Sequence, residues 1–208
     1  MAKKQRLDKA IAMQGSLSRS EVKTLIRKGA VTVNGQVVKN ADFGVDFDSD
    51  TVAVQGKELS LSMHIYLMLN KPKGVVSASE DKKLPTVVDL VPKELWRKGL
   101  FPAGRLDKDT TGFVLITDDG EFAHDILSPK KHISKTYHAL VNGTITDEMV
   151  EGFAKGVTIG EDFTLPASLK KISSEEQGDW GEVILKEGMY HQIKRMFGAY
   201  GLKVLEPV

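Results

Sequence analysis

The sequence contains no cysteine among its 208 residues. A disulfide framework and thiolate chemistry are therefore excluded, and the composition is compatible with a reducing compartment. No apolar run approaches the ~20 residues of a membrane span, and the start MAKKQRLDK has no apolar segment typical of a signal peptide. These absences favour a protein of the cytoplasm that does not associate with membranes.

Several motifs of common enzymes are also missing. Neither a Walker A motif nor GxGxxG is present, so the sequence lacks the glycines of a nucleotide-binding loop, and there is no GxSxG elbow. The five histidines show no metal-ligand spacing, which without cysteine argues against a zinc site. Asp118 and Asp119 adjoin each other at a strand end, where neighbouring side chains point apart, so a glycosidase-like carboxylate pair is poorly supported.

The net charge is only +1, but the charges are unevenly distributed. Residues 1–40 carry nine Lys and Arg against two acidic residues, whereas the next twenty carry five acidic residues against one lysine. This asymmetry suggests a basic head that contacts a polyanion. A solvated helix face is the alternative, and charge alone would favour it.

The first 40 residues have the pattern of a small, compact unit. RLDKAIAMQ (6–14) has helical spacing, and Ser18 with Glu21 forms a capping box at the start of a second helix. Gly29 stands where a C-terminal cap belongs. VTVNGQVV then places two β runs around an Asn-Gly pair, which is the strongest short signal for a hairpin.

Basic side chains recur every four residues along the second expected helix and therefore share one of its faces. Such a row suits contact with phosphates, which supplies affinity and register without reading bases. The unit resembles the S4 RNA-binding domain in RLDKAIA, in SRSEVKTLIRKGAVTVNG and in the apolar-acidic strand beyond them. The resemblance implies that the head binds RNA, but it does not imply a reaction. The expected contacts are Arg6, Arg19, Lys23 and Arg27.

The composition changes near residues 58–63, where we place a boundary between an S4 domain (1–60) and a catalytic domain (61–208). Beyond it, strand-like and helix-like segments alternate irregularly with hairpin-length gaps. The expected strands include HIYLMLNKPKG, TYHALVNG and WGEVILKEG. The expected helical segments are PTVVDLVPKEL, TDEMVEGFAKGV and MYHQIKRMFGAYG. The predicted fold class is α+β: an S4 unit of two helices and a β hairpin, then a mostly antiparallel, mixed sheet flanked by helices.

A charged loop precedes one apolar strand in GRLDKDTTGFVLITDDG (104–120). Its apolar part predicts a buried strand, and the charged residues RLDKD stand before it. A charged loop that leads into a core strand is either plain surface or a site that the strand holds in place. Two other segments also combine reactive and charged side chains, namely KTY (135–137) and EGMYHQIKRMF (187–197).

These segments resemble the motifs of the pseudouridine synthases, in the branch that modifies ribosomal RNA and carries an N-terminal S4 domain. The matching stretches are GRLDKDTTGFVLITDDG, NKPKG, SPKKHISKTY and EGMYHQIKRMFGAYG, in the family's order and spanning nearly the whole chain. DTTGFVLITDDG and FAKGVTIGEDFTLPA look most like the small-subunit rRNA enzymes, the RsuA type. The resemblance implies isomerisation of uridine 516 in 16S rRNA, with no cofactor and no metal. The sequence does not indicate an oligomeric state, and a monomer is the default expectation. A large-subunit rRNA enzyme and a non-catalytic RNA-binding or ribosome-assembly factor are the alternatives.

The resemblance assigns roles to four side chains. Asp107 matches the aspartate that acts at the sugar–base junction, and Lys194 matches the cation that keeps this carboxylate ionised despite burial. Tyr137 matches the tyrosine that stacks on the target base and takes part in proton movement. Arg105 matches a residue that helps to displace the flipped base. Without the resemblance, these residues would be a turn carboxylate, a solvated helix end, a strand aromatic and plain surface.

Further basic residues are expected to contact RNA phosphates, whereas His191 and Gln192 are expected to be structural. The expected phosphate contacts are Lys71, Lys130, Lys131 and Arg195. The chain's end, LKVLEPV, departs from the family pattern, which continues with an arginine-containing strand. The resemblance therefore implies a truncated C-terminal end, either because the sequence is trimmed or because the protein has lost a segment that would add a strand to the sheet.

Overall fold

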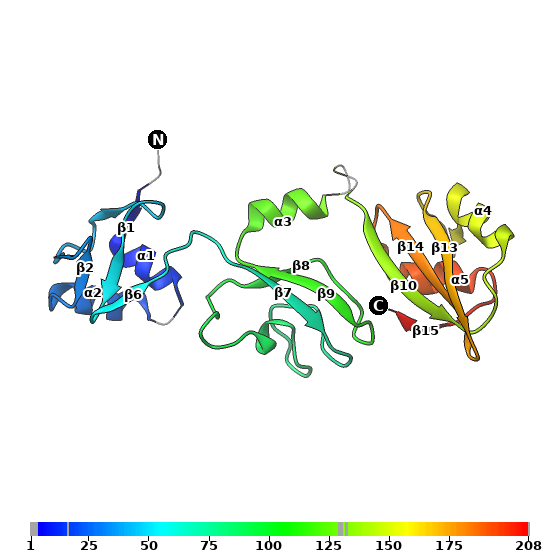
Figure 1. Cartoon of the computed structure of the whole chain (residues 1–208), viewed down its shortest axis with the longest axis horizontal. Coiled ribbons are helices and arrows are strands. Elements are labelled where there is room, and N and C mark those ends of the chain that lie inside the picture. The colour runs from blue at the N-terminus through cyan, green and yellow to red at the C-terminus, as the bar shows by residue number, and fades with distance from the viewer. Residues whose placement is uncertain (1–3, 16, 129–130, 132, 208) are drawn as a thin grey trace.

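The computed structural model describes residues 4–15, 17–128, 131 and 133–207. Its helices and strands form three successive groups along an elongated chain (Figure 1). In the described part of the chain, no helix has the length and apolar character needed to cross a membrane.

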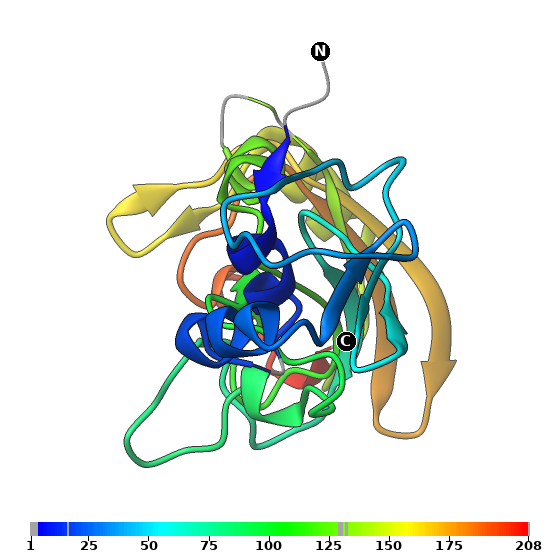
Figure 2. The same cartoon turned by 90° about the vertical axis from the view of Figure 1, so that its left-hand side faces the viewer.

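The first group is the basic head. Its elements are β1 (Gln5–Arg6), α1 (Leu7–Met13), α2 (Arg19–Arg27), β2 (Val31–Val33), β3 (Gln36–Val37), β4 (Gly44–Val45), β5 (Val52–Val54) and β6 (Lys57–Leu59). An antiparallel sheet has the order β3-β2-β5-β6, and β1 pairs with β4. Viewed end-on, α1 and α2 lie together beside these strands (Figure 2).

Local sequence signals account for the head's fold. The hydroxyl of Ser18 accepts from the amide of Glu21, and the Glu21 carboxylate accepts from the amide of Ser18, so both halves of the capping box form. Asn34 and Gly35 have φ of +50° and +78°, as a type I′ hairpin turn requires. The core beneath the sheet consists of Leu7, Ile11, Val22, Ile26, Val31, Val33, Val45, Val52 and Val54.

The second group is built on a three-stranded antiparallel sheet. Its elements are β7 (Tyr66–Lys71), η1 (Val88–Leu90), β8 (Phe101–Ala103), β9 (Gly112–Thr117) and α3 (Gly120–Leu127). The strand order is β7-β9-β8. β7 ends where Pro72 has no N–H to donate. The expected helical segment 85–95 forms only the single 3₁₀ turn η1.

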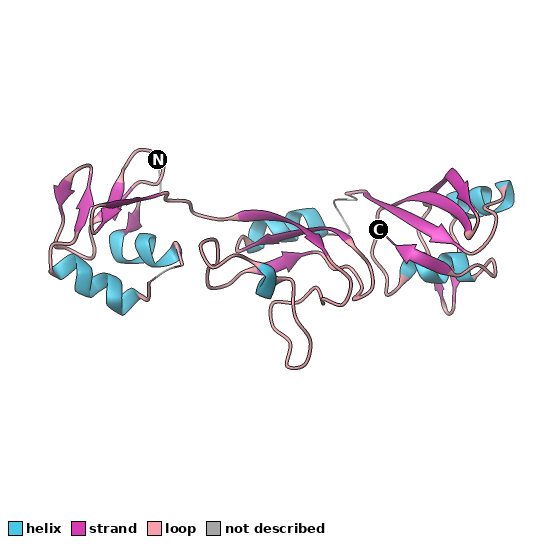
Figure 3. Cartoon of the chain, turned by 60° about the horizontal axis from the view of Figure 1, so that its bottom comes forward, coloured by secondary structure: helices cyan, strands magenta, loops and turns pink. Residues whose placement is uncertain are grey.

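The third group contains a four-stranded antiparallel sheet with order β13-β14-β10-β15. Its elements are β10 (Lys135–Val141), α4 (Asp147–Lys155), β11 (Thr158–Ile159), β12 (Asp162–Phe163), β13 (Ser168–Glu175), β14 (Gly178–Leu185), α5 (Gln192–Gly198) and β15 (Val204–Pro207). Helices α4 and α5 flank this sheet (Figure 3). On α4, Met149 and Phe153 are buried, whereas Ala154 is exposed.

All pairings between the described strands are antiparallel, and the parallel bridge Val76–Thr86 lies outside them. The predicted α+β class is therefore confirmed. The head has a core of its own, and the two other groups each have another. The domain boundary at residue 60 stays a prediction.

Candidate active site

An open cleft of about 540 Å³ lies between the loop before β9 and the segment that begins α5. This volume falls within the ~300–1,000 Å³ of small-molecule sites. Arg105 and Asp107 line it from the loop, Tyr137 lines it from β10, and Lys194 lines it from α5. Segments that lie far apart in the sequence thus meet at one place.

Asp107 lies between two basic groups in this cleft. Its Oδ2 is 3.5 Å from Nζ of Lys194, and its Oδ1 is 3.5 Å from Nε2 of His191. Both distances exceed the ~2.7–2.9 Å of a charge-assisted hydrogen bond. The side chains of Asp107 and Lys194 are each 32% exposed. The carboxylate is attracted by its two neighbours but remains open to the cleft. The sequence analysis expected it to be buried, whereas about a third of its side chain is exposed.

The backbone at Asp107 is fixed by a side chain from another loop. The hydroxyl of Ser77 donates to the carbonyl of Leu106 (2.9 Å) and accepts from its amide (3.0 Å). The amide of Thr110 donates to the carbonyl of Asp107 (3.1 Å), closing a turn. Because a small displacement of a reacting group can cost much of the rate, these bonds matter for any chemistry at Asp107. The sequence analysis did not single out Ser77.

Lys71 is buried beneath the same loop, which corrects the expectation that it contacts phosphate. Its side chain is fully buried, and its ammonium donates to the carbonyls of Pro72 (2.9 Å) and Lys108 (3.0 Å). The amide of Gly74 also donates to the Lys108 carbonyl, at 2.9 Å. Burial lowers the pKa of Lys71, and nearby negative charges oppose that shift. Lys71 therefore supports the loop from inside and cannot reach a phosphate.

Tyr137 forms one wall of the cleft and packs against the core of the third group. Burial raises the pKa of its phenol, and the charge of Asp107 raises it further. The phenol is therefore protonated at neutral pH. It can offer a flat ring to a base and a hydroxyl hydrogen as a donor.

His191 lies in the cleft, although the sequence analysis treated it as structural. It adopts a left-handed conformation (φ +48°) just before α5, which turns its ring toward Asp107. The ring stacks on Tyr190, with centroids 3.8 Å apart, and Tyr190 is 76% exposed. The spacing of His191 and Lys194, three residues apart, was the available signal for a shared face.

Gln192 has the structural role that was expected. Its side chain is buried, its amide group donates to Glu187 (2.6 Å), and its oxygen accepts from the Met189 amide (2.9 Å). These bonds hold the segment that leads into α5. His191 and Lys194 are placed in the cleft as a result.

Arg195 points away from the cleft, which corrects its expected contact with RNA. Its guanidinium donates to the carbonyls of Ile159 and Tyr190 and pairs with Asp162 at 3.2 Å. It therefore ties the β11–β12 hairpin to α5. Adjacent residues on a helix point about 100° apart, so Lys194 and Arg195 could not both face the cleft.

The other expected RNA contacts have different surroundings. Arg105 is exposed at the edge of the cleft. Lys131 is also exposed and lies 3.6 Å from Asp125, so a surface carboxylate partly balances its charge. Lys130 lies outside the described residues.

Basic side chains of the head surround a buried carboxylate. Asp8 has no exposed surface, and it accepts from Arg6 (3.1 Å) and from Arg19 (3.1 Å), with Lys23 at 3.8 Å. Burial by itself raises the pKa of Asp8. The hydrogen bonds and charges of the two arginines outweigh this effect and lower the pKa to about 2. The basic side chains themselves are 41–51% exposed, and Arg27 is exposed on the same helix. Asp8 holds Arg6, Arg19 and Lys23 in place, and these side chains remain accessible to a polyanion.

Among the described residues, no three His, Asp or Glu side chains gather where they could hold a metal ion. The geometry is instead that of an open cleft with a carboxylate, a lysine and a tyrosine, in a chain that also carries a basic head. Residues 65–199 match the family model described as RNA pseudouridylate synthase, and residues 5–52 match the S4 domain. The chain belongs to the RNA pseudouridine synthases that carry an S4 domain, and these enzymes are isomerases.

Its relatives include pseudouridine synthases named for the small ribosomal subunit and for the large one. The chain is 43% identical over 201 residues to "Uncharacterized RNA pseudouridine synthase YtzG" of Bacillus subtilis, covering 96% of this chain and 84% of that protein. It is 43% identical to "Ribosomal small subunit pseudouridine synthase A" of Escherichia coli (97% and 86% covered). It is 38% identical to "Ribosomal large subunit pseudouridine synthase B" of Bacillus subtilis (97% and 83% covered). A solved structure titled "Crystal structure of pseudouridylate synthase" is 36% identical, with a TM-score of 0.60, covering 97% of this chain and 86% of that one.

Proposed function

We propose that this protein converts a uridine of small-subunit ribosomal RNA into pseudouridine, at the position of uridine 516 in 16S rRNA. The stretches DTTGFVLITDDG and FAKGVTIGEDFTLPA, which look most like the small-subunit enzymes, support this choice. The identities of 43% and 38% to the small- and large-subunit enzymes do not separate the two targets. The proposed partner is rRNA or a precursor of the small subunit, in the cytoplasm. A monomeric state stays a prediction.

The observation that carries the proposal is the position of Asp107 between Lys194 and His191, opposite Tyr137, in one cleft. In the reaction the bond from C1′ to N1 of uracil breaks, the base turns, and C1′ bonds to C5. The C5 proton is then lost and N1 is protonated, so nothing is oxidised and no group is imported. A charged oxygen at the sugar–base junction supports both bond changes, and the ammonium of Lys194, 3.5 Å away, attracts the Asp107 carboxylate and orients it.

The other expected site residues have complementary roles in the proposal. The Tyr137 ring stacks on the target base, which must leave its helix or start in an unpaired loop. Arg105, exposed at the edge of the cleft, occupies the space that the flipped base leaves. The basic side chains around Asp8, together with Arg27, bind phosphates of the same RNA. Lys131 is a further proposed phosphate contact.

Release of tritium from 5-labelled uridine tests the proposal directly. A precursor of the small subunit with labelled 16S rRNA should lose about one tritium per molecule, and labelled 23S rRNA should lose none. Asp107→Asn should abolish the release. The matched control is Asp109→Asn, which removes the same charge from an exposed residue of the same loop and should retain activity. Release from 23S rRNA alone would assign the enzyme to the large subunit.

The alternative is a non-catalytic RNA-binding or assembly role, which would use the same ordered basic cluster of the head. If this role holds, 16S rRNA binds equally to the natural chain and to the Asp107→Asn variant, with no tritium released by either. Tritium release that depends on Asp107 would exclude it.

A further inference from the structure

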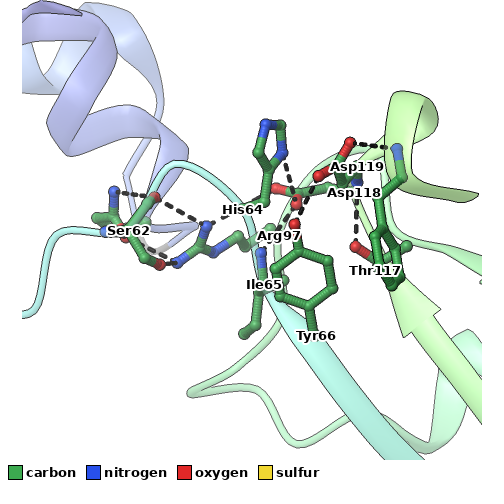
Figure 4. A network of polar contacts seen from close by, with 10 residues as sticks. Ser62, His64, Ile65, Tyr66, Arg97, Thr117, Asp118 and Asp119 are labelled. Atoms are coloured by element: carbon green, nitrogen blue, oxygen red, sulfur yellow. Dashed lines mark hydrogen bonds and ion pairs between the residues drawn. The ribbon is translucent and has the colours of Figure 1, made fainter. Parts of the chain in front are cut away.

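A second polar cluster lies outside the cleft, where the head meets the second group (Figure 4). At its centre is Arg97, in the loop between η1 and β8, which is only 6% exposed. Its guanidinium donates to Oε1 of Gln14 (2.8 Å) and to the hydroxyl (2.7 Å) and carbonyl (3.2 Å) of Ser62. It also lies 3.7 Å from Oδ2 of Asp118.

These partners come from separate parts of the chain. Gln14 is the C-terminal cap of α1 in the head, Ser62 is in the segment that joins the head to β7, and Asp118 follows β9. Gln14 and Ser62 also bond to each other through the Gln14 amide group, at 3.3 and 3.4 Å. A buried guanidinium is costly unless its donors are satisfied, and its planar fork can hold several acceptors at fixed angles. Arg97 therefore fastens three segments at one point.

The cluster is continuous with the framework of the second group. Asp118 accepts from the amide of Ile65 (3.0 Å) and lies 3.3 Å from Nδ1 of His64. Asp119 accepts from the hydroxyl of Tyr66 and caps α3. Its charge, through that hydrogen bond, raises the pKa of Tyr66 to about 12. Figure 4 shows these side chains gathered at the end of β9.

The position of this cluster on β9 connects the head to the active site. β9 begins directly after the loop that carries Asp107 and ends at the cluster. The same short, paired strand thus has the reacting carboxylate before one end and the attachment of the head at the other.

Close backbone packing at the same junction is an independent observation. Gly15 follows Gln14 with φ of +94°, and a β-carbon there would collide with the carbonyl oxygen of Trp96, the residue before Arg97. Only glycine allows the end of α1 to approach this loop so closely. The head is therefore seated on the loop by backbone contact as well as held by hydrogen bonds.

We propose that Arg97 latches the head to the catalytic part and sets the distance from the basic face of α2 to the Asp107 cleft. Arg97 is thus a positioning residue for long RNA. An RNA held by the head then presents to the cleft only nucleotides at a fixed reach, so the latch selects among uridines of similar local sequence. This inference rests on the proposed role of the head in binding the substrate RNA.

The first test measures the latch without catalysis. Because the chain has no cysteine, Gln36→Cys and Glu161→Cys, both at exposed positions, would carry a donor and an acceptor dye for single-molecule energy transfer. The parent protein should give a single narrow distribution of energy-transfer efficiency, and Arg97→Met should broaden this distribution. Lys98→Met removes the same charge from the exposed neighbour and should leave the distribution narrow. An unchanged distribution in Arg97→Met would overturn the proposal.

The second test compares a long and a short substrate, 16S rRNA in a subunit precursor and a stem-loop too short to reach the head. Arg97→Met should lower kcat/KM for the long substrate about tenfold, through KM, because the head no longer supplies a high effective concentration. The short stem-loop should be unaffected, and Gln14→Leu should repeat this pattern. An equal loss on both substrates, or no advantage of the long one in the parent protein, would overturn the proposal. If the parent isomerises neither 16S nor 23S rRNA, the proposed function fails while energy transfer still decides on the latch.

Discussion

The head and the cleft each contain an aspartate beside basic side chains, but the two arrangements differ. Asp8 is fully buried and accepts charge-assisted hydrogen bonds of 3.1–3.3 Å from two arginines. Asp107 is 32% exposed, and its basic neighbours stand 3.5 Å away on both sides. The first carboxylate is sealed by its partners, whereas the second has room beside it.

This difference separates a carboxylate that holds a structure together from one that reacts in the proposed function. A sealed carboxylate gains from several hydrogen bonds to charged donors, which offset the cost of burying its charge. A reacting carboxylate must instead exchange its protein neighbours for a substrate atom without first breaking strong bonds. The loop around Asp107 is correspondingly firm in its backbone, through Ser77 and Lys71, and loose at the carboxylate itself.

The comparison is tested most severely by removing each charge in turn. Asp107→Asn should lower turnover at least about 10³-fold, the scale of losing an essential acid–base or nucleophilic group, and leave the free energy of unfolding within about 0.5 kcal/mol. Asp8→Asn should have the opposite effect. It should keep the turnover of a short stem-loop and lower the free energy of unfolding of the protein. Tritium release and urea unfolding measure the two effects. A strongly destabilised Asp107→Asn would mean that this aspartate is structural as well.

The pair of Asp107 and Lys194 can also be tested by changing the lysine. Lys194→Met should lower kcat about 10²-fold, because Asp107 loses the cation that attracts and orients it. Lys194→Arg keeps the charge and should restore most of the activity. Single-turnover rates at saturating RNA provide the check, because they report the chemical step separately from binding. Equal activity of the methionine and arginine variants would remove Lys194 from the mechanism.

The sealed pair predicts a dependence of stability on pH. The folded pKa of Asp8 is about 2, below its ordinary value of 3.8. Its contribution to stability is therefore complete above about pH 4 and is lost as the pH falls through 2. Because its partners are about half exposed and screened by solvent, the loss should be on the order of 1–2 kcal/mol. Amide hydrogen exchange in α1 and α2 between pH 5 and 2 would measure it, and Asp8→Asn should abolish this dependence.

The elements that the sequence predicted correctly depend mainly on neighbouring residues. The capping box at Ser18 and the Asn-Gly hairpin are set within four residues, and the strand from Gly112 to Thr117 follows from its own apolar content. The resemblance selected Asp107, Tyr137 and Lys194, which the fold brings to one cleft. Their roles stay a proposal.

The predictions that failed depend on contacts distant in the sequence. The alternation in β7 carried a signal for Lys71, since Leu67 and Leu69 share its inward face, but a lysine among charged loops was taken as surface. Ser77 and Arg97 belong to no motif, and their partners lie 21 to 83 residues away. Only the folded chain shows that these polar side chains are buried and paired.

The smallest predicted effect is a change in RNA affinity, and it distinguishes a basic residue of α2 that is bonded to Asp8 from one that is not. Arg19 is bonded to Asp8, whereas Arg27 is exposed in the last turn of the helix. Arg27→Gln should weaken RNA binding about threefold and reduce the slope of log affinity against log salt by about 0.7, as expected for one lost contact with single-stranded RNA. Arg19→Gln should weaken binding similarly but also lower the stability of the head, because Asp8 loses a partner. Lys57→Gln, an exposed charge on β6, is the control and should change neither quantity. An equal change of slope in Lys57→Gln would mean that RNA responds to the overall charge of the head and not to the face of α2.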